Sequence, residues 1–322
     1  MFKNITLELT YRCNLNCDFC YLGHSGRLNK PRRELATAEI FSLIGRFGAG
    51  AHFYLSGGEP FLRADIFDII ARIKKAGSHF GVNTNGTLLV PAKAERLAAL
   101  GPDYVIFSLH GSEAAHDRLT GKKGAWRGLM RNLKAFAAAA RPGTDIIVNC
   151  VVNRENAGEL AEVYKAAAGA GARRVVFEYL QFLRPGEAAG TPARLRAGGI
   201  ITPVLKDYGA DAALINAQFG AILRLKKRPA HFETRPLMSE SGLDLYYNGE
   251  IRPVGPCGKA LTTLNVEPDG RIRLCALYGL EAGDALKTDF AKVLAFKKKN
   301  ISAGLPGACA RCCQRLEIFR HF

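Results

Sequence analysis

Short apolar segments typical of β-strands alternate over the first 180 residues with longer segments whose apolar residues have helical spacing. In the second of the longer segments, for example, Ile66, Ile70 and Ile73 fall on one helix face. The expected strands cover residues 5–10, 52–56, 79–83, 104–108, 146–152 and 174–180. The expected helices between them cover residues 37–46, 63–76, 91–100, 125–140 and 157–168. The pattern therefore predicts six strand–helix units.

Regular alternation with short connections predicts parallel strands with helices packed outside them. Six units are too few for a closed eight-stranded barrel, so we expect an α/β fold with an open, partial (β/α)6 barrel similar to a TIM barrel. Active sites in such folds gather at the C-terminal ends of the strands.

Beyond the sixth unit the pattern changes. Residues 183–199 are rich in Gly, Pro and Arg and predict a loop. Residues 202–227 predict a long helix with Thr202 as N-cap and Pro203 as its first residue, ended by Pro229. Short strands, turn pairs and cysteines follow. We therefore expect three parts: a barrel (1–200), a linking helix and loop (201–236), and a small cysteine-rich α+β domain (237–322).

The net charge is +16, with 45 Lys and Arg against 29 Asp and Glu. Such an excess attracts phosphate esters, nucleotides, nucleic acid or an acidic partner, although it also fits solvated helix faces. No basic run is interleaved with base-stacking aromatic residues, which argues against nucleic acid. No apolar run reaches the roughly 20 residues of a membrane span, and no secretory signal precedes the first strand, so we expect a cytoplasmic protein without a membrane partner.

Nine cysteines in such a chain argue for metal ligation rather than for disulfides. Cys13, Cys17 and Cys20 follow the first strand with C-x3-C-x2-C spacing. Three thiolates in one short loop can hold three corners of a metal cluster and leave the fourth open to bind and activate a ligand. A zinc knuckle or three unrelated thiols are the alternatives.

A second set of cysteines lies near the C-terminus. Asp269-Gly270 predicts a hairpin that brings Cys257 and Cys275 together, and Cys309-x2-Cys312 forms a tight pair. Four thiolates from separate segments can fully enclose one cluster, and a structural zinc ion is the alternative. The adjacent Cys313 either replaces Cys312 as a ligand, donates a hydrogen atom, or has no role.

Strand periodicity predicts which side chains face the cavity, because the outer face of the strands meets the helices. Polar residues at the strand ends are best placed on the inner face. The residues expected to point inward are Ser108, His110, Asn149 and Asn153. Cys150 then points outward into packing, and His116 is expected on the surface.

The cysteine loop resembles that of the radical S-adenosylmethionine (SAM) enzymes, over residues 4–182. Three strand ends strengthen the resemblance. The segment from Ser56 to Pro60 matches the GGEP motif of the family, residues 83–87 read Asn-Thr-Asn-Gly-Thr, and residues 108–111 read Ser-Leu-His-Gly. The C-terminal cysteines resemble the Twitch domain, the short form of the SPASM domain, which implies one auxiliary [4Fe–4S] cluster.

The resemblance implies that Cys13, Cys17 and Cys20 hold a [4Fe–4S] cluster whose open iron is chelated by SAM. One electron then yields a 5′-deoxyadenosyl radical, which takes a hydrogen atom from a substrate C–H bond. The residues expected to bind the cofactor are Phe19, Gly57, Gly58, Glu59, Pro60, Asn85, Ser108 and Asn153. Catalytic roles are expected for His110, where many members have aspartate, and for Cys313.

These features predict a radical SAM oxidoreductase that acts on a small molecule, an anionic one included, and receives electrons from a flavodoxin- or ferredoxin-type donor. The auxiliary cluster favours an oxidation or an oxidative bond formation. A peptide-modifying enzyme or an epimerase is the alternative, although no leader-binding domain of ~80 residues precedes the first strand. The alternative from another class is a zinc-containing, basic nucleic-acid-binding protein.

Overall fold

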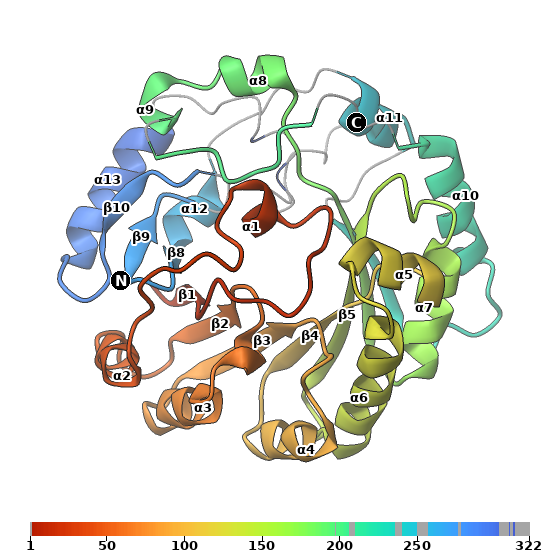
Figure 1. The fold of residues 1–322 in the computed structure, drawn as a ribbon, viewed down its shortest axis with the longest axis horizontal. Coiled ribbons are helices and arrows are strands. Elements are labelled where there is room, and N and C mark those ends of the chain that lie inside the picture. The colour runs from red at the N-terminus through yellow and green to blue at the C-terminus, as the bar shows by residue number, and fades with distance from the viewer. Residues whose placement is uncertain are drawn as a thin grey trace.

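A computed structural model of the chain describes residues 2–196, 198–205, 210–235, 240–249, 257–275 and 278–302, together with residues 309 and 312. Within these residues, ten strands form one sheet in the order β10-β9-β8-β1-β2-β3-β4-β5-β6-β7 (Figure 1). The first seven strands are β1 (Asn4–Glu8), β2 (His52–Ser56), β3 (His79–Thr84), β4 (Tyr104–Ser108), β5 (Asp145–Val152), β6 (Arg174–Tyr179) and β7 (His231–Arg235). The last three are β8 (Thr263–Val266), β9 (Arg271–Arg273) and β10 (Glu281–Asp284).

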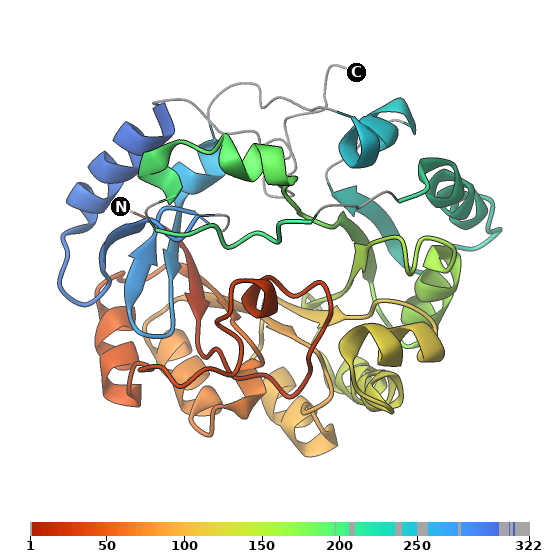
Figure 2. The same cartoon turned by 45° about the horizontal axis from the view of Figure 1, so that its top comes forward.

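Neighbouring strands from β1 to β7 are parallel, and β8 pairs in parallel with β1 on the other side. β9 and β10 continue from β8 as antiparallel strands. The sheet curls into a barrel-like wall that stays open, because β7 and β10 are its two edges. Figures 1 and 2 show the loop that carries α1 (Tyr21–His24) in the middle of the ring of strands and helices.

Helices cover the outer face of the sheet (Figure 1). Those of the first six units are α2 (Thr37–Gly45), α3 (Ile66–Lys75), α4 (Pro91–Ala99), α5 (Glu113–Thr120), α6 (Ala125–Ala139) and α7 (Leu160–Gly169), with a short 3-10 turn, η1 (Pro60–Leu62). Further along are α8 (Pro185–Ala189), α9 (Ala193–Arg196), α10 (Ala212–Leu223), α11 (Glu240–Asn248), α12 (Gly258–Thr262) and α13 (Phe290–Ser302). No described helix has both the length and the apolar character that crossing a membrane requires.

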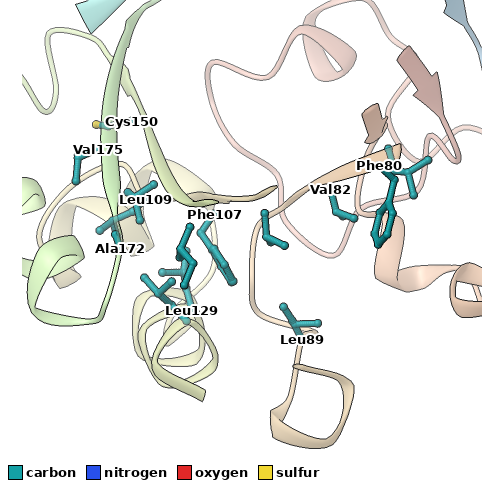
Figure 3. Packing of buried hydrophobic residues seen from close by; sticks show 14 of the residues in the cluster. Phe80, Val82, Leu89, Phe107, Leu109, Leu129, Cys150, Ala172 and Val175 are labelled. Carbon is teal, nitrogen blue, oxygen red and sulfur yellow. The ribbon is translucent and has the colours of Figure 1, made fainter. Parts of the chain in front are cut away.

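The main core lies between the outer strand face and these helices. Every second residue of the strands points into it, so Val82, Phe107 and Val175 are completely buried. Figure 3 shows Phe107 pointing toward Leu129 of α6, with Cys150 near Val175. The outward, buried placement predicted for Cys150 is therefore confirmed.

The predicted α/β fold with an open, partial barrel is confirmed, and the six expected strands lie within two residues of the observed ones. The sequence pattern missed that β7 and β8 extend the parallel sheet beyond six units. Because β8 pairs with β1, residues assigned to a C-terminal domain continue the same sheet as the barrel. The domain boundaries themselves stay a prediction.

The long helix predicted over 202–227 is wrong. The segment after Thr202 is extended, because Leu183 donates to Pro203 O at 2.8 Å and Leu205 donates back to Leu183 O at 2.8 Å. The helix α10 begins only at Ala212, where Asp211 accepts a hydrogen bond from Leu214 N at 2.9 Å and acts as the N-cap.

Candidate active site

A cavity of about 700 Å³ is enclosed by the inner face of the strands and by the loops at their C-terminal ends. Both cysteine sets line it. The predicted site residues that the structure brings together around this cavity are Cys13, Cys17, Phe19, Cys20, Gly57, Gly58, Asn85, Ser108, His110, Cys257, Cys275, Cys309 and Cys312. Three others, Glu59, Pro60 and Asn153, do not line the cavity, and Cys313 lies outside the described residues.

The first cysteine loop is held by backbone hydrogen bonds. Cys20 N donates to Cys17 O at 3.0 Å, which forms a turn directly before α1. Cys13 N donates to the side chain of Asn29 at 2.8 Å. Two groups donate to the Cys13 sulfur: Leu15 N at 3.5 Å and the Asn85 amide at 3.8 Å. These contacts fix the loop and direct donors at a sulfur ligand, as cluster sites require.

The three thiols form one electrostatic unit. Burial raises the pKa of Cys13 to about 11 and raises the pKa values of Cys17 and Cys20 as well. The charges of Cys20 and Cys13 raise the pKa of Cys17 further, which means that the three sulfurs are close enough to repel one another as thiolates. Clustered iron ions would offset this repulsion, and thiolates are the ligands that iron–sulfur clusters use. The donor set therefore fits a [4Fe–4S] cluster.

The GGEP turn packs against the stem of the cysteine loop. A Cβ atom on Gly57 would lie 2.4 Å from Thr10 O, and one on Gly58 would lie 2.2 Å from Arg12 O. Gly57 also has φ +128°, which side chains disfavour. Backbone hydrogen bonds from Gly58 N to Thr10 O (2.7 Å) and from Glu59 N to Arg12 O (2.8 Å) join the two segments. The absence of side chains at Gly57 and Gly58 therefore allows the backbone of residues 10–12 to approach closely. We had expected these glycines to make room only for the cofactor.

Glu59 is completely buried behind the cavity wall. Its carboxylate accepts hydrogen bonds from Thr84 Oγ1 (2.8 Å), Asn85 N (2.8 Å) and Phe61 N (3.1 Å). Burial raises its pKa to about 7, against the lowering effect of these donors. Glu59 therefore holds the Asn85 turn in place, and its expected direct contact with the cofactor finds no support in this placement. Pro60, the first residue of η1, is buried beside it.

The polar wall opposite the cysteine loop comes from β4 and β5. Ser108 and Asn149 are register partners, and both line the cavity as predicted. Asn153 is used locally: its Oδ1 accepts from Glu155 N at 2.9 Å and its Nδ2 donates to Val151 O at 3.3 Å. Its expected inward position is therefore not observed, because it closes the loop after β5.

His110 lies on this wall with its ring edge-on to Phe19, at 4.7 Å between ring centroids. Its Nδ1 accepts a hydrogen bond from Val151 N at 3.2 Å. Burial, and then the neighbouring His116, hold its pKa well below the usual 6.5. The ring is therefore neutral at pH 7, and because Nδ1 accepts, the proton is assigned to Nε2. His110 thus offers an N–H donor at the cavity wall.

The expectation of a surface position for His116 is wrong. The side chain is fully buried, and its Nδ1 accepts a hydrogen bond from His110 N at 3.2 Å. Burial lowers its pKa to about 4, so this ring is neutral too. His116 therefore fixes the backbone that presents His110.

Two groups of cavity residues were missed from the sequence. Glu178 lines the cavity at the end of β6 and accepts from Asn149 Nδ2 at 2.8 Å. Its signal was present, since the alternation of β6 places Glu178 on the same inner face as Arg174 and Val176, at the C-terminal end of the strand. Among the described residues no cation pairs with its carboxylate.

The second group is a buried ionic bridge. Glu8, at the end of β1, accepts from Arg273 and from Tyr21 Oη, the latter at 3.1 Å. Arg273 Nε also lies 3.3 Å from Glu267. Tyr21 follows Cys20, and Arg273 precedes Cys275 by two residues, so the bridge ties the two cysteine segments together. Because Glu8 and Arg273 are 265 positions apart, no local sequence pattern predicts their contact.

The second cysteine set is built on α12 and the β8–β9 hairpin. Cys257 directly precedes α12, and Cys275 follows β9. The predicted hairpin is confirmed, with Gly270 at φ +92°. Cys312 N donates to Cys309 O at 3.4 Å. None of the eight described cysteines forms a disulfide.

In the described part of the chain, no three His, Cys, Asp or Glu side chains come close enough together to hold one metal ion. A four-iron cluster presents four separate corners to its ligands, and thiolates are the side chains that usually occupy them. Soft thiolates around one shared cavity fit such clusters, and the site as a whole defines a radical SAM enzyme with an auxiliary-cluster domain.

Comparison with known proteins agrees. The sequence profile described as "Radical SAM superfamily" matches residues 7–167, and the chain belongs to this superfamily. It is 30% identical over 275 residues to a PqqA peptide cyclase of Methylocella silvestris, covering 83% of this chain and 66% of the relative. It is 24% identical over 325 residues to an AdoMet-dependent heme synthase of Nitratidesulfovibrio vulgaris, covering 96% of this chain and 84% of the relative.

The fold is also similar to that of SuiB from Streptococcus suis, solved in complex with the precursor peptide SuiA. The TM-score is 0.64 at 18% identity, covering 91% of this chain and 64% of SuiB. This chain thus spans just under two thirds of the length of SuiB and of the PqqA cyclase. The cofactors of the superfamily are a [4Fe–4S] cluster and SAM, and Cys13, Cys17 and Cys20 match its cluster motif.

Proposed function

We propose that this protein is a radical SAM enzyme that oxidatively modifies a peptide, and that its auxiliary cluster accepts the electron released. The observation that carries the proposal is that both cysteine sets line one cavity of about 700 Å³. A substrate in this cavity would lie between the group that starts the reaction and the group that accepts the electron.

The peptide is favoured over the small molecule expected from the sequence because of the relatives. A PqqA peptide cyclase is 30% identical, and the similar fold of SuiB was solved with a precursor peptide. The sporulation killing factor maturation protein SkfB of Bacillus subtilis is 33% identical over 170 residues. The peptide-modifying enzyme, which was the alternative hypothesis from the sequence, is therefore preferred to an enzyme that acts on a small molecule.

When bound, the first cluster and SAM supply a 5′-deoxyadenosyl radical that takes a hydrogen atom from the substrate. The chain's residues hold and shield the reactants. Cys13, Cys17 and Cys20 would hold the first cluster, and backbone groups of the Ser56–Gly58 turn lie at the cavity edge, where they can accept from an amino group. Ser108 and Asn149 offer hydrogen bonds to hydroxyl groups, and Phe19 offers a face or edge for an adenine ring.

Two residues would contact the substrate itself. Glu178 offers a carboxylate without a described cationic partner, which suits an ammonium, amide or hydroxyl group of a peptide side chain. His110 Nε2–H offers a donor for a peptide carbonyl. A flavodoxin- or ferredoxin-type protein would deliver the starting electron.

A heme-related activity is the second candidate. The AdoMet-dependent heme synthase matches this chain over 96% of its length and is itself covered to 84%, a closer agreement in length than the PqqA cyclase gives. The net charge of +16 also suits an anionic small molecule.

One experiment separates these candidates. The host is grown in deuterated medium, its lysate is fractionated, and each fraction is incubated with the anaerobically reconstituted protein, unlabelled SAM and dithionite. Deuterium found in 5′-deoxyadenosine by mass spectrometry marks the fraction that holds the substrate. A signal from the peptide fraction that protease treatment removes supports the proposal. A protease-resistant signal from the tetrapyrrole extract favours the heme-related activity, and no 5′-deoxyadenosine at all rejects both.

A further inference from the structure

Lys297 of α13 is a buried cation beside the second cysteine set. Its side chain has no exposed surface. The ammonium group donates to Ala260 O at 3.2 Å and to Thr263 O at 2.8 Å, and it lies 5.5 Å from the ring centroid of Phe2. These contacts place the charge directly behind α12, the helix that Cys257 precedes.

This charge has no carboxylate counter-ion among the described residues. Removing an ammonium from water without an anionic partner is unfavourable, and two carbonyls and an aromatic face offset only part of that cost. Burial, with a smaller contribution from the nearby Arg273, lowers the pKa of Lys297 to about 8. The negative charges that oppose this shift belong to the thiolates of Cys275 and Cys257. Arg273 is itself paired with Glu8.

The side-chain packing around Lys297 also places it next to the second cysteine set. The neighbour of Lys297 in sequence, Phe296, and the hydrogen-bonded Ala260 pack in one apolar cluster with the cysteine set. The members of that set are Cys257, Cys275, Cys309 and Cys312. Lys297 itself is completely buried, so water does not surround its charge and its interaction with the sulfur ligands is less screened than at a protein surface.

We propose that Lys297 is the buried counter-charge of the auxiliary cluster and makes this cluster easier to reduce. The inference rests on the proposed function, in which the cluster takes one electron from the substrate radical left by hydrogen abstraction. Reduction adds one negative charge to the cluster, and a fixed cation stabilises the reduced form more than the oxidised form. Lys297 is thus a positioning and tuning residue that touches no substrate.

The test uses three variants of the full chain, reconstituted anaerobically. Lys297→Gln keeps amide donors for the two carbonyls but removes the charge, and Lys297→Arg keeps the charge. Lys298→Gln removes the same charge one residue later from an exposed position and is the matched control. An EPR-monitored redox titration with SAM present measures the midpoint potential of the cluster whose signal SAM does not alter.

The expected result is a more negative midpoint potential in Lys297→Gln, with Lys297→Arg and Lys298→Gln near the wild type. Full iron content with an unchanged midpoint potential in Lys297→Gln overturns the inference about Lys297 and leaves the proposed function standing. If Lys297→Gln loses the auxiliary irons, the iron content of Lys297→Arg is decisive. Full iron content in Lys297→Arg supports the role of Lys297 as a counter-charge, and loss of the auxiliary irons in this variant too overturns it. Wild-type protein with about four irons instead of about eight overturns the two-cluster function and the inference with it.

Discussion

The side-chain amide of Asn85 donates a hydrogen bond to Cys13 Sγ, with 3.8 Å between nitrogen and sulfur. The same amide donates to Asn14 Oδ1 at 2.9 Å, and its backbone N–H is held by the buried Glu59. A motif at the end of β2 thus positions a residue at the end of β3, which in turn contacts a cysteine after β1. The three strand-end motifs act as one unit around the first cluster.

Asn85→Ala should therefore make the first cluster harder to reduce. A hydrogen bond to a charged sulfur stabilises negative charge, and losing one worth about 1.5 kcal/mol corresponds to about tenfold slower SAM cleavage. The measurements are the midpoint potential by EPR and the rate of 5′-deoxyadenosine release. Asn16→Ala, an exposed change in the same loop, is the control. Equal potentials in both variants would refute this role for Asn85.

Loss of any of Cys13, Cys17 and Cys20 should abolish SAM cleavage. Each alanine variant is expected to hold about four of about eight irons, because only the auxiliary site stays complete. Iron analysis and chromatography of 5′-deoxyadenosine check this. Cys150→Ala removes a thiol that is buried in the core away from the cavity, so it should keep the full iron content. If all three loop variants still cleave SAM, the assignment of the first site is wrong.

The auxiliary site should be needed for product but not for the start of the reaction. Cys275→Ala is expected to retain SAM cleavage and lose the modified peptide, because the electron from the substrate has no acceptor. The measured quantity is product formed per 5′-deoxyadenosine, with labelled lysate peptide as substrate. An unchanged ratio would mean that the second cysteine set has no part in turnover.

The parts of this protein that depend on local patterns were predictable. Buried parallel strands are near-continuous apolar runs, which explains why strands such as 104–108 were located to the residue. The alternation of inner and outer faces correctly placed Ser108 and Asn149 on the cavity and Cys150 in the core. The cysteine spacing predicted the first metal site without any information on the fold, and the superfamily match agrees with that prediction.

The errors came from contacts between distant segments. Thr202 followed by Pro203 is a valid helix start, but pairing with Leu183 makes the segment extended and leaves the start to Asp211. His116 lies in a helix with a mostly polar sequence, and its contacts with the backbone and ring of His110 at the end of β4 could not be predicted from that sequence.

Gly58→Ala should destabilise the protein because the added Cβ has no space. It would lie 2.2 Å from Arg12 O, a backbone atom that cannot move without displacing the cysteine loop. Overpacking of this kind costs about 3 kcal/mol. Gly169→Ala is the control, because nothing lies within 4 Å of its added Cβ and alanine favours the helix. Urea unfolding should show a lower midpoint for Gly58→Ala alone, and equal midpoints would contradict the packing role.

The contribution of Glu59 to the free energy of unfolding should fall as pH rises. Burial raises its pKa to about 7 in the folded protein, from an ordinary value of 4.5. A raised pKa means that the folded state binds the proton more tightly, so this stabilising contribution is complete below about pH 4.5 and is lost as pH rises through 7. Two and a half pKa units correspond to about 3 kcal/mol.

The neutral variant Glu59→Gln lacks this titration. The free energy of unfolding of the wild type, minus that of Glu59→Gln, should therefore fall by about 3 kcal/mol between pH 4 and pH 8. Anaerobic urea unfolding at several pH values measures it. Glu95→Gln, which removes an exposed carboxylate from α4, gives the baseline for losing one negative charge. A difference between wild type and Glu59→Gln that stays constant across this range would show that the folded protein does not raise the pKa of Glu59.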